Sequence, residues 1–569
     1  MKRIFISILI SVAAFSSVSC SLEENVYTQT DESYITDAAM SETLLMGVYR
    51  KLGVDGIYKQ NLPFIFNMTT DESKPEGSST TPPRAEGCNY FNASSSYVQA
   101  TWRDLYSAVY DANYFIDFMG RKAGTFSEED QEKCAYYVAE AKALRALLYF
   151  ELVRWFGNVP LVLSPDESYK KPEEFKQADP NDVYAQIVSD LNDAAEVLPY
   201  SGEADLRANP AFRFSKGGVL GLLAKVYATW AGYPLYSEGK WELAAAAAEE
   251  VIQNGNHALL TDFVQLWKNS ASNVWDPSES LIELSYWSPL ATSESSGRVG
   301  NINGVRGNQG CLRNNAPGHN VFCYFHPTFL ANWKDYAKDK RFAVSYADYQ
   351  YTANGKEYYV SKTVNGVKNT PISFVMALEA EDKDKENWRG TYNYRLTHGK
   401  WDTELYVPDE NYNTAANVTN INWYLMRYSD VLLLYAEALN EVNQGPTSVA
   451  YEMVNMVRRR GFGLDYTVPS EDADLEEGLS YEGFQKAIRD ERAWEFAGEA
   501  HRRQDLIRWG IYVDTVYETY NNLSTWHSNA YTYFVGAREK YTIKGRHELL
   551  PIPQREIDLC GYKQNPNWN

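Results

Sequence analysis

Adjacent carboxylates at Asp71 and Glu72 are the residue types from which acid–base catalysis could be built. Retaining glycoside hydrolysis needs two carboxyl groups about 5 Å apart that face the same bond. Neighbouring residues usually point in different directions, so this pair does not predict a catalytic site. The sequence also lacks the His-Glu-x2-His zinc motif, the Gly-x-Ser-x-Gly elbow and a phosphate-binding loop. No catalytic residue is therefore predicted.

Composition and charge exclude several further classes of function. The seven histidines show no pair at the spacing of metal ligands, and neither a metal nor another cofactor is predicted. The formal net charge of −21 repels phosphate backbones, so nucleic acid is not an expected partner. Six cysteines in 569 residues are too few for a disulfide framework. Whether Cys311 and Cys323 form a single bridge is left open.

The amino-terminal segment has the order of a secretory signal. Two basic residues precede an apolar run from residue 4 to residue 15, and small residues then lead into Cys20. The run is too short to cross a bilayer core of about 30 Å. The segment resembles a bacterial lipobox, although Ser17 stands where leucine is usual. We therefore expect residues 1–19 to be a signal peptide and Cys20 to carry lipid; a plain secretory signal with an unmodified cysteine is the alternative.

The polar residues after the predicted lipidation site are expected to form a tether. Residues 20–31 are hydrophilic and have nothing to bury, so we expect them to be flexible. The acidic residues directly after Cys20 resemble the export signal of surface lipoproteins in Bacteroides-like bacteria. That resemblance implies attachment to the cell outer membrane through lipid alone, with the folded part facing the extracellular side.

Beyond the tether, apolar residues recur at steps of three and four, which is the period of amphipathic helices. The helices form pairs of about 35 residues with alanine at inward positions, as in tetratricopeptide-like repeats. Such pairs cannot bury their apolar faces alone, so they must stack on one another. The predicted faces contain Ala141, Leu144, Leu148, Leu152 and Trp155; Leu222, Val226, Tyr227 and Trp230; Trp241, Ala248, Val251 and Ile252; Val431, Leu434, Tyr435 and Ala438; Val449 to Val457; Phe484, Ile488, Trp494 and Ala497; and Leu506, Ile507, Trp509 and Ile511.

Between about residues 260 and 425 the helical period gives way to Gly, Asn, Ser, Tyr and Trp. We therefore divide the chain after the tether into an amino-terminal helical part (32–260), a loop-rich insertion with a few short strands (261–425) and a carboxy-terminal helical part (426–569). The predicted fold class is mainly α.

Charged residues in the carboxy-terminal part also stand at helical spacing. We expect them to form salt bridges along and between helices, and we assign them no catalytic role. They are Arg427, Asp430, Glu437, Glu491, Arg492, Glu495, Arg502, Asp505 and Arg508.

Four segments, taken together and in this order, resemble the SusD/RagB family. They are Trp102-x3-Tyr106 followed by 140–161 (EAKALRALLYFELVRWFGNVPL), then 426–440 (MRYSDVLLLYAEALN), 491–510 (ERAWEFAGEAHRRQDLIRWG) and 550–568 (LPIPQREIDLCGYKQNPNW). The resemblance spans nearly the whole chain after the signal. It implies a SusD-like fold, in which a tetratricopeptide-like scaffold carries a loop-rich insertion.

The resemblance also implies a partner and a ligand. Members of the family sit as a lid on a SusC-like TonB-dependent transporter and present a ligand on the face turned towards it. The ligand implied first is a glycan, and a peptide, as in the RagB branch, is the alternative. A surface glycoside hydrolase with a helical barrel is the remote alternative. The family fold implies that two loops, 71–91 and 286–324, form the ligand surface.

Residue types in these two loops suit sugar recognition. Apolar faces of sugar rings pack on aromatic rings, and hydroxyls need donors and acceptors such as Asn, Asp and Arg. Trp287 is the best candidate, because it opens the insertion where the starch-binding prototype also places an aromatic residue. Loop 71–91 lacks the tryptophan pair of that prototype, which argues against starch, and the sequence does not name the glycan. The predicted ligand-binding residues are Asn89, Tyr90, Phe91, Tyr286, Trp287, Arg306, Asn308 and Asn315, with Arg313 and Asn314 as further candidates.

Overall fold

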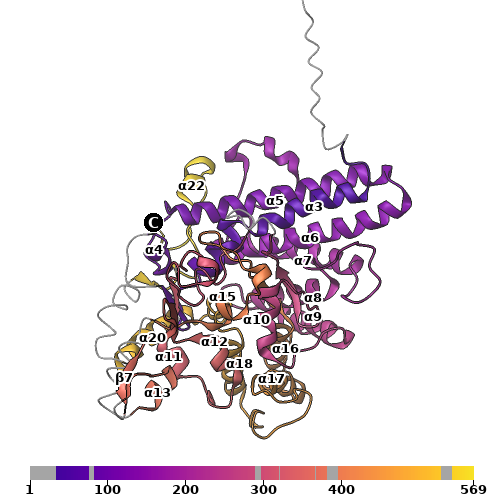
Figure 1. Ribbon diagram of the computed structural model, residues 1–569. Coiled ribbons are helices and arrows are strands. Elements are labelled where there is room, and N and C mark those ends of the chain that lie inside the picture. The colour runs from indigo at the N-terminus through magenta and orange to yellow at the C-terminus, as the bar shows by residue number, and fades with distance from the viewer. Residues whose placement is uncertain are drawn as a thin grey trace, which may run out of the picture.

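The computed structural model describes residues 34–75, 82–288, 296–319, 321–364, 367–380, 395–526 and 541–568. The predicted signal peptide, the tether and Cys20 lie outside these residues. Helices dominate, and the long helices α3, α5, α6 and α7 lie side by side across one end of the molecule (Figure 1). No helix of the described residues is long and apolar enough to cross a membrane.

The helices stack in chain order. Packing runs from α5 to α6, α7, α8 and α9, then from α9 to α16, which also contacts α17 and α18. The predicted helical faces lie in these helices except at Ala497, Trp509 and Ile511, which fall in the turns after α18 and α19, so the periodicity is confirmed for the rest. The longer helices are α3 (Ala38–Leu52), α5 (Ser96–Lys122), α6 (Glu128–Phe156), α7 (Pro180–Val197), α8 (Lys216–Ala231), α9 (Lys240–Asn254), α10 (Phe263–Ser272), α16 (Tyr428–Asn443), α17 (Ser448–Gly461), α18 (Tyr481–Glu495), α19 (Arg502–Arg508), α20 (Tyr512–Trp526) and α22 (Gln554–Cys560). The shorter ones are α4 (Arg84–Gly87), α11 (Pro327–Ala331), α12 (Lys340–Ser345), α13 (Phe374–Glu379) and α15 (Thr403–Tyr406).

Helix α6 shows how local sequence sets the ends of an element. Ser127 caps its amino terminus by accepting a hydrogen bond from the backbone N–H of Asp130 at 3.2 Å. Three acidic residues in the first turn suit the positive end of the helix dipole. The helix ends at Gly157, whose φ of 68° lies in the left-handed region that favours glycine.

Short antiparallel strand pairs, rather than one large sheet, connect the helices in the described part of the chain. The pair β2–β10 lies next to α8, where a Cβ added at Gly218 would stand 2.7 Å from the carbonyl oxygen of Leu281. Glycine therefore permits this close approach. The pairs are β1 (Ser73–Pro75) with β3 (Cys323–Phe325), β2 (Ser280–Leu284) with β10 (Trp423–Arg427), β4 (Tyr346–Ala347) with β9 (Thr397–His398), β5 (Tyr349–Thr352) with β6 (Gly355–Tyr358), and β7 (Ser361–Val364) with β8 (Val367–Pro371).

Among the described residues, the two largest apolar cores are one in the stacked helices and one beneath the insertion. The larger one runs through the stacked helices, from Leu45 on α3 to Ile488 on α18. A second, smaller core forms where α11, α12 and α13 pack on α18, around Trp333, Phe342 and Trp494. The insertion therefore rests on the carboxy-terminal helices through its own apolar contacts.

Cys311 carries a free thiol, so it does not form the bridge that the sequence left open.

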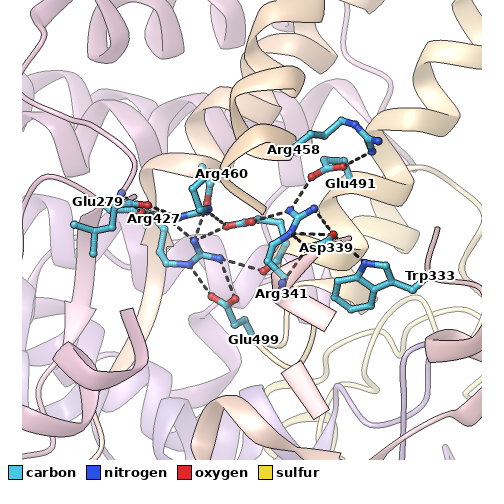
Figure 2. A network of polar contacts seen from close by, with 12 residues as sticks. Glu279, Trp333, Asp339, Arg341, Arg427, Arg458, Arg460, Glu491 and Glu499 are labelled. Carbon is cyan, nitrogen blue, oxygen red and sulfur yellow. Dashed lines mark hydrogen bonds and ion pairs between the residues drawn. The ribbon is translucent and has the colours of Figure 1, made fainter. Parts of the chain in front are cut away.

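A buried network of salt bridges, called the Arg427 network below, joins the carboxy-terminal helices to the insertion (Figure 2). Arg427, the residue before α16, lies 2.9 Å from Glu279 and 2.7 Å from Glu495. Its Nε lies 2.8 Å from Glu499. Charges in the network balance, which is what allows them to be buried. The cations are Arg341, Lys400, Arg427, Arg458 and Arg460, and the carboxylates are Glu279, Asp339, Glu491, Glu495 and Glu499.

The predicted salt bridges of the carboxy-terminal helices are confirmed. Arg492 lies 2.8 Å from Asp430 and 2.9 Å from Asp505. Arg508 lies 2.6 Å from Glu437, with both side chains almost fully buried. These contacts connect α16, α18 and α19, so they brace the stack.

Glu283, in the middle of β2, is a buried carboxyl group that has no cation against it among the described residues. Burial raises its pKa to about 7, although hydrogen bonds from Ser280 at 2.6 Å and Asn422 at 2.9 Å favour the charged form. A folded-state pKa above the unfolded value means that stability is highest below about pH 4.5 and falls as the pH rises through 7. We expect Glu283→Gln to raise the free energy of unfolding by about 2–3 kcal/mol at pH 8 and to change it little at pH 4.5.

Urea unfolding at the two pH values measures this difference. The control is Glu410→Gln, which changes an exposed carboxylate. Equal stability of wild type and Glu283→Gln at pH 8 would contradict the prediction.

Candidate ligand-binding site

Main-chain pairing brings the two predicted ligand loops together. Strand β1 pairs with β3, so that Ser73 lies opposite Phe325 and Pro75 opposite Cys323. Strand β1 lies at the start of loop 71–91 and β3 at the end of loop 286–324, about 250 residues further along the chain. The pairing fixes the start of one loop against the end of the other.

A cavity of about 430 Å³, called the Tyr90 cavity below, opens beside the first of these loops. It is walled by α4, the segment that leads into α5 and the segment that begins at Tyr541. Tyr90 is 43% exposed, and its ring centroid lies 4.3 Å from that of Tyr541. Glu86 is buried; its Oε1 accepts from Ser95 Oγ at 2.7 Å, while its Oε2 has no hydrogen-bond partner among the described residues. Aromatic rings beside an unpaired acceptor can hold a ring that bears hydroxyl groups.

The neighbours of Tyr90 have different roles. Phe91 is half-buried, lines the cavity and packs against Trp568 at a ring-centroid distance of 5.1 Å. Asn89 is 2% exposed, donates to Tyr512 at 3.0 Å and accepts from Arg503 at 3.2 Å. The Asn89 amide ties this loop to the carboxy-terminal segment, and the residue also lines the Tyr90 cavity, so its contact with a ligand stays a prediction.

Trp287 and Tyr286 point in opposite directions, as consecutive residues of an extended segment do. Trp287 is 43% exposed, and its Nε1 donates to Asn411 Oδ1 at 3.1 Å, so the indole is held in place at the surface. Tyr286 is 4% exposed, and its ring lies against Gly297, where an added Cβ would meet it at 2.6 Å. The ring of Tyr286 faces the interior in this structure, so its predicted contact with a ligand stays a prediction that the burial does not favour.

The remaining predicted residues lie further along the insertion. Arg306, Asn308 and Asn315 are exposed, and the backbone near Arg306 is held by Tyr351, whose N–H donates to the Arg306 carbonyl at 2.9 Å. Asn314 is exposed as well. The structure does not bring these side chains into the Tyr90 cavity.

Arg313 is committed to structural contacts. Its Nη1 lies 2.7 Å from Asp409, its Nη2 donates to the carbonyl of Val407 at 2.7 Å, and its guanidinium stacks over Tyr412 at 4.4 Å. Asp409 belongs to the same short turn as Asn411, which holds Trp287. This turn therefore anchors two parts of the insertion.

Charged groups surround Tyr97, which follows the residues that line the Tyr90 cavity. Burial raises the pKa of Tyr97; the charges of Glu86 and Asp55 raise it further, and Arg298 opposes them. Arg298, from the insertion, lies 3.7 Å from Asp55. The insertion therefore contributes a charge close to the amino-terminal part of the site, while Trp287 does not line the Tyr90 cavity.

Sequence reasoning missed several residues of this region. Tyr541 and Arg546 line the Tyr90 cavity, but they come about 450 positions after Tyr90, and no local pattern links them. Glu86 lies inside loop 71–91, which was predicted to form part of the ligand surface. Its carboxylate can accept a hydrogen bond from a sugar hydroxyl, so it could have been named from the sequence. Charges on Asp55 and Arg298 meet only in the folded chain.

The carboxylates at Asp71 and Glu72 take part in separate contacts. Asp71 lies 2.7 Å from Arg502. Glu72 is 3% exposed, and its Oε1 accepts from the backbone N–H of Gly498 at 3.0 Å. Burial raises the pKa of Glu72 to about 7. Both groups tie loop 71–91 to the start of the last helices.

Comparison with known proteins shows which family this chain resembles in sequence and in fold. The SusD family model matches residues 326–568, and the family described as "Starch-binding associating with outer membrane" matches residues 22–228. A crystal structure of a SusD homolog from Bacteroides thetaiotaomicron is 40% identical, with a TM-score of 0.88 over 95% of this chain and 99% of that one. The chain belongs to the SusD family. The predicted relationship and the mainly helical SusD-like fold are thereby confirmed.

Other SusD-family proteins are more distant. The SusD-like protein P25 of Formosa agariphila is 27% identical over 90% of this chain and 86% of its own length. Surface glycan-binding protein A from Bacteroides thetaiotaomicron, solved with laminarihexaose, is 18% identical with a TM-score of 0.65 over 93% of this chain and 99% of that one. At that identity the similarity concerns the fold.

Proposed function

We propose that this SusD-family chain is a cell-surface lipoprotein that binds oligo- or polysaccharide and delivers it, without chemical change, to a SusC-like TonB-dependent transporter. The observation that carries the proposal is the Tyr90 cavity, which is lined by the adjacent rings of Tyr90 and Tyr541 and by Glu86, whose Oε2 has no hydrogen-bond partner among the described residues. The ring faces suit the apolar side of a sugar, and the carboxylate oxygen suits a hydroxyl. A family member solved with laminarihexaose supports the same class of ligand.

Trp287 extends this surface beyond the cavity. Its indole is exposed and fixed by Asn411, so little side-chain freedom is lost when a sugar ring packs on it. A polysaccharide has many rings, and a second platform allows a longer stretch of it to bind. We assign the cavity and Trp287 to one extended binding face; Arg306, Asn308 and Asn315 remain predicted contributors at its edge.

Affinity electrophoresis and calorimetry against plant, microbial and host polysaccharides test the proposal. We expect at least one polysaccharide to bind, and Tyr90→Ala to weaken that binding about tenfold, because the ring platform is lost. Tyr169→Ala is the matched control, since Tyr169 is 87% exposed and does not line the Tyr90 cavity. Binding that is unchanged in both Tyr90→Ala and Trp287→Ala would contradict the site.

Two further outcomes separate the alternatives. Heat on mixing with peptides, falling as salt is added, together with none for any polysaccharide would favour the peptide ligand. Release of reducing sugar by the purified protein would contradict a non-catalytic role. For delivery, a photo-crosslinker placed at residue 90 is expected to capture a TonB-dependent transporter on intact cells, whereas one placed at residue 169 is not.

A further inference from the structure

A second cavity, called the Gln504 pocket below, lies apart from the two predicted ligand loops. It has a volume of about 400 Å³ and is formed by the end of α6, the start of α7, the turn between α8 and α9, helix α19 and the carboxy-terminal segment. This volume falls in the range of about 300–1,000 Å³ that small-molecule pockets occupy. Its apolar walls come from Tyr184, Tyr233, Pro234, Leu235, Leu549 and Pro566.

Three polar side chains that line the pocket have a buried atom without a partner among the described residues. They are Gln504 through Nε2, Arg546 through Nε and Glu548 through Oε2. Gln504 is only 9% exposed. Buried donors and acceptors are nearly always paired in folded proteins, so three unpaired atoms around one cavity point to a bound molecule that supplies the missing bonds.

Two of the three side chains, Glu548 and Arg546, are held in place by other contacts. Glu548 Oε1 accepts from the backbone N–H of Gly545 at 3.1 Å. The Arg546 guanidinium lies 4.2 Å from the ring centroid of Trp568, and its Nη2 donates to the carbonyl of Phe91 at 3.4 Å. The unpaired atoms are therefore presented by oriented groups.

The charged side chains around the Gln504 pocket indicate which class of molecule can bind in it. Arg154 and Arg508, which also line the pocket, are neutralised by Glu151 and Glu437. Arg546 and Glu548 carry opposite charges, so the unpaired set is two donors and one acceptor with no net charge. Asp179 also lines the pocket, but it is exposed to solvent and accepts from the backbone N–H of Asn181. A neutral molecule with hydroxyl groups meets this set, because each hydroxyl both donates and accepts. Its apolar side would pack on Tyr184 and Tyr233.

From this geometry we propose that the Gln504 pocket is a second saccharide site, which takes one or two neutral sugar rings. The proposal rests on the glycan-binding function proposed above. Arg546 lines both the Tyr90 cavity and the Gln504 pocket, so the two sites share a wall. The occupant is then either a separate short saccharide or the end of a chain that also fills the Tyr90 cavity.

Saturation-transfer NMR with cellobiose, laminaribiose, maltose and xylobiose tests the pocket. We expect at least one disaccharide to bind the wild-type chain and the Tyr90→Ala variant. Leu235→Trp should weaken that binding about tenfold or more by filling the pocket, and Gln504→Leu should weaken it by removing the unpaired donor. Neither variant removes a hydrogen bond, and thermal melting confirms that each is folded.

The outcomes separate this proposal from the proposed function. Disaccharide binding that is lost in Tyr90→Ala and kept in Leu235→Trp assigns the sugar to the Tyr90 cavity and overturns the second site. A wild-type chain that binds a polysaccharide but no disaccharide, or soaked crystals with water alone in the pocket, also overturns it. Disaccharide binding that depends on Leu235, with no polysaccharide bound, upholds the pocket while the proposed function fails. A longer oligosaccharide whose affinity falls in both variants identifies one chain spanning both sites.

Discussion

Replacing Arg427 with methionine is expected to lower the free energy of unfolding by about 3–5 kcal/mol, because it leaves buried carboxylates without their cation. The Arg427 side chain is 1% exposed and its guanidinium contacts Glu279, Glu495 and Glu499 (Figure 2). Methionine fills a similar volume, so little of the loss comes from an empty space. The excess negative charge must be neutralised by protonation or reached by water, and both require the structure to open.

The pKa of Glu495 shows how strongly the Arg427 network holds its carboxylates. Burial alone would raise this pKa, but the guanidinium groups of Arg460, Arg427 and Arg341 hold it well below its usual range. A depressed pKa means that the stabilisation is present above the unfolded value of about 4.5 and is lost as the pH falls towards the folded value. The difference between wild type and Arg427→Met should therefore be large at neutral pH and should shrink in strong acid.

Urea unfolding followed by circular dichroism measures the change. The control is Arg121→Met, which breaks the exposed pair of Arg121 and Asp117 and should cost about 0–1 kcal/mol. A loss for Arg427→Met no larger than that of the control would show that the network does not stabilise the fold.

Replacing Cys20 with serine is expected to move the protein from the membrane fraction to the soluble fraction of the cell envelope or to the medium. Each buried methylene of an acyl chain contributes about 0.8 kcal/mol to anchoring, and stable attachment needs two chains or more. The described residues contain no helix that could span a membrane. Cleavage before Cys20 removes Lys2 and Arg3, which takes the formal net charge from −21 to −23 and disfavours binding to anionic lipid. We therefore expect lipid on Cys20 to be what holds the protein to the membrane.

Fractionation, together with labelling by an alkyne analogue of palmitate, tests the anchor. The control is Cys311→Ser, which changes a free thiol of the folded part. Cys20→Ser protein that stays with the membrane or still takes up the label would contradict lipidation at this residue. Protease treatment of intact cells tests the predicted outward orientation, since an inward-facing protein would be protected.

The helices were predictable because their signals are local. The apolar spacing of residues 141–155 and the stop at Gly157 define α6 whatever lies around it. The ion pairs of Arg492 and Arg508 follow from the same spacing. By contrast, Arg341 and Lys400 join the Arg427 network from the insertion. The sequence there has no helical period from which their ion pairs could be predicted.

The binding face was predictable only in part, because side-chain direction is set by contacts between distant segments. Tyr90 and Trp287 are exposed, whereas Asn89 and Tyr286, one position before each, are buried. The partners that bury Asn89 lie more than 400 positions away, at Arg503 and Tyr512. Composition identified the loops as rich in suitable residues, but it could not show which of them face outwards.

The pairing of β1 with β3 has a consequence for how this scaffold diversifies. Three main-chain positions hold the two surface loops against each other, and main-chain hydrogen bonds do not depend on which side chains those loops carry. Substitutions, insertions and deletions within the two loops can therefore accumulate without breaking this strand pairing. Related proteins can therefore differ in the sequences of these two loops while they keep the same pairing of β1 with β3.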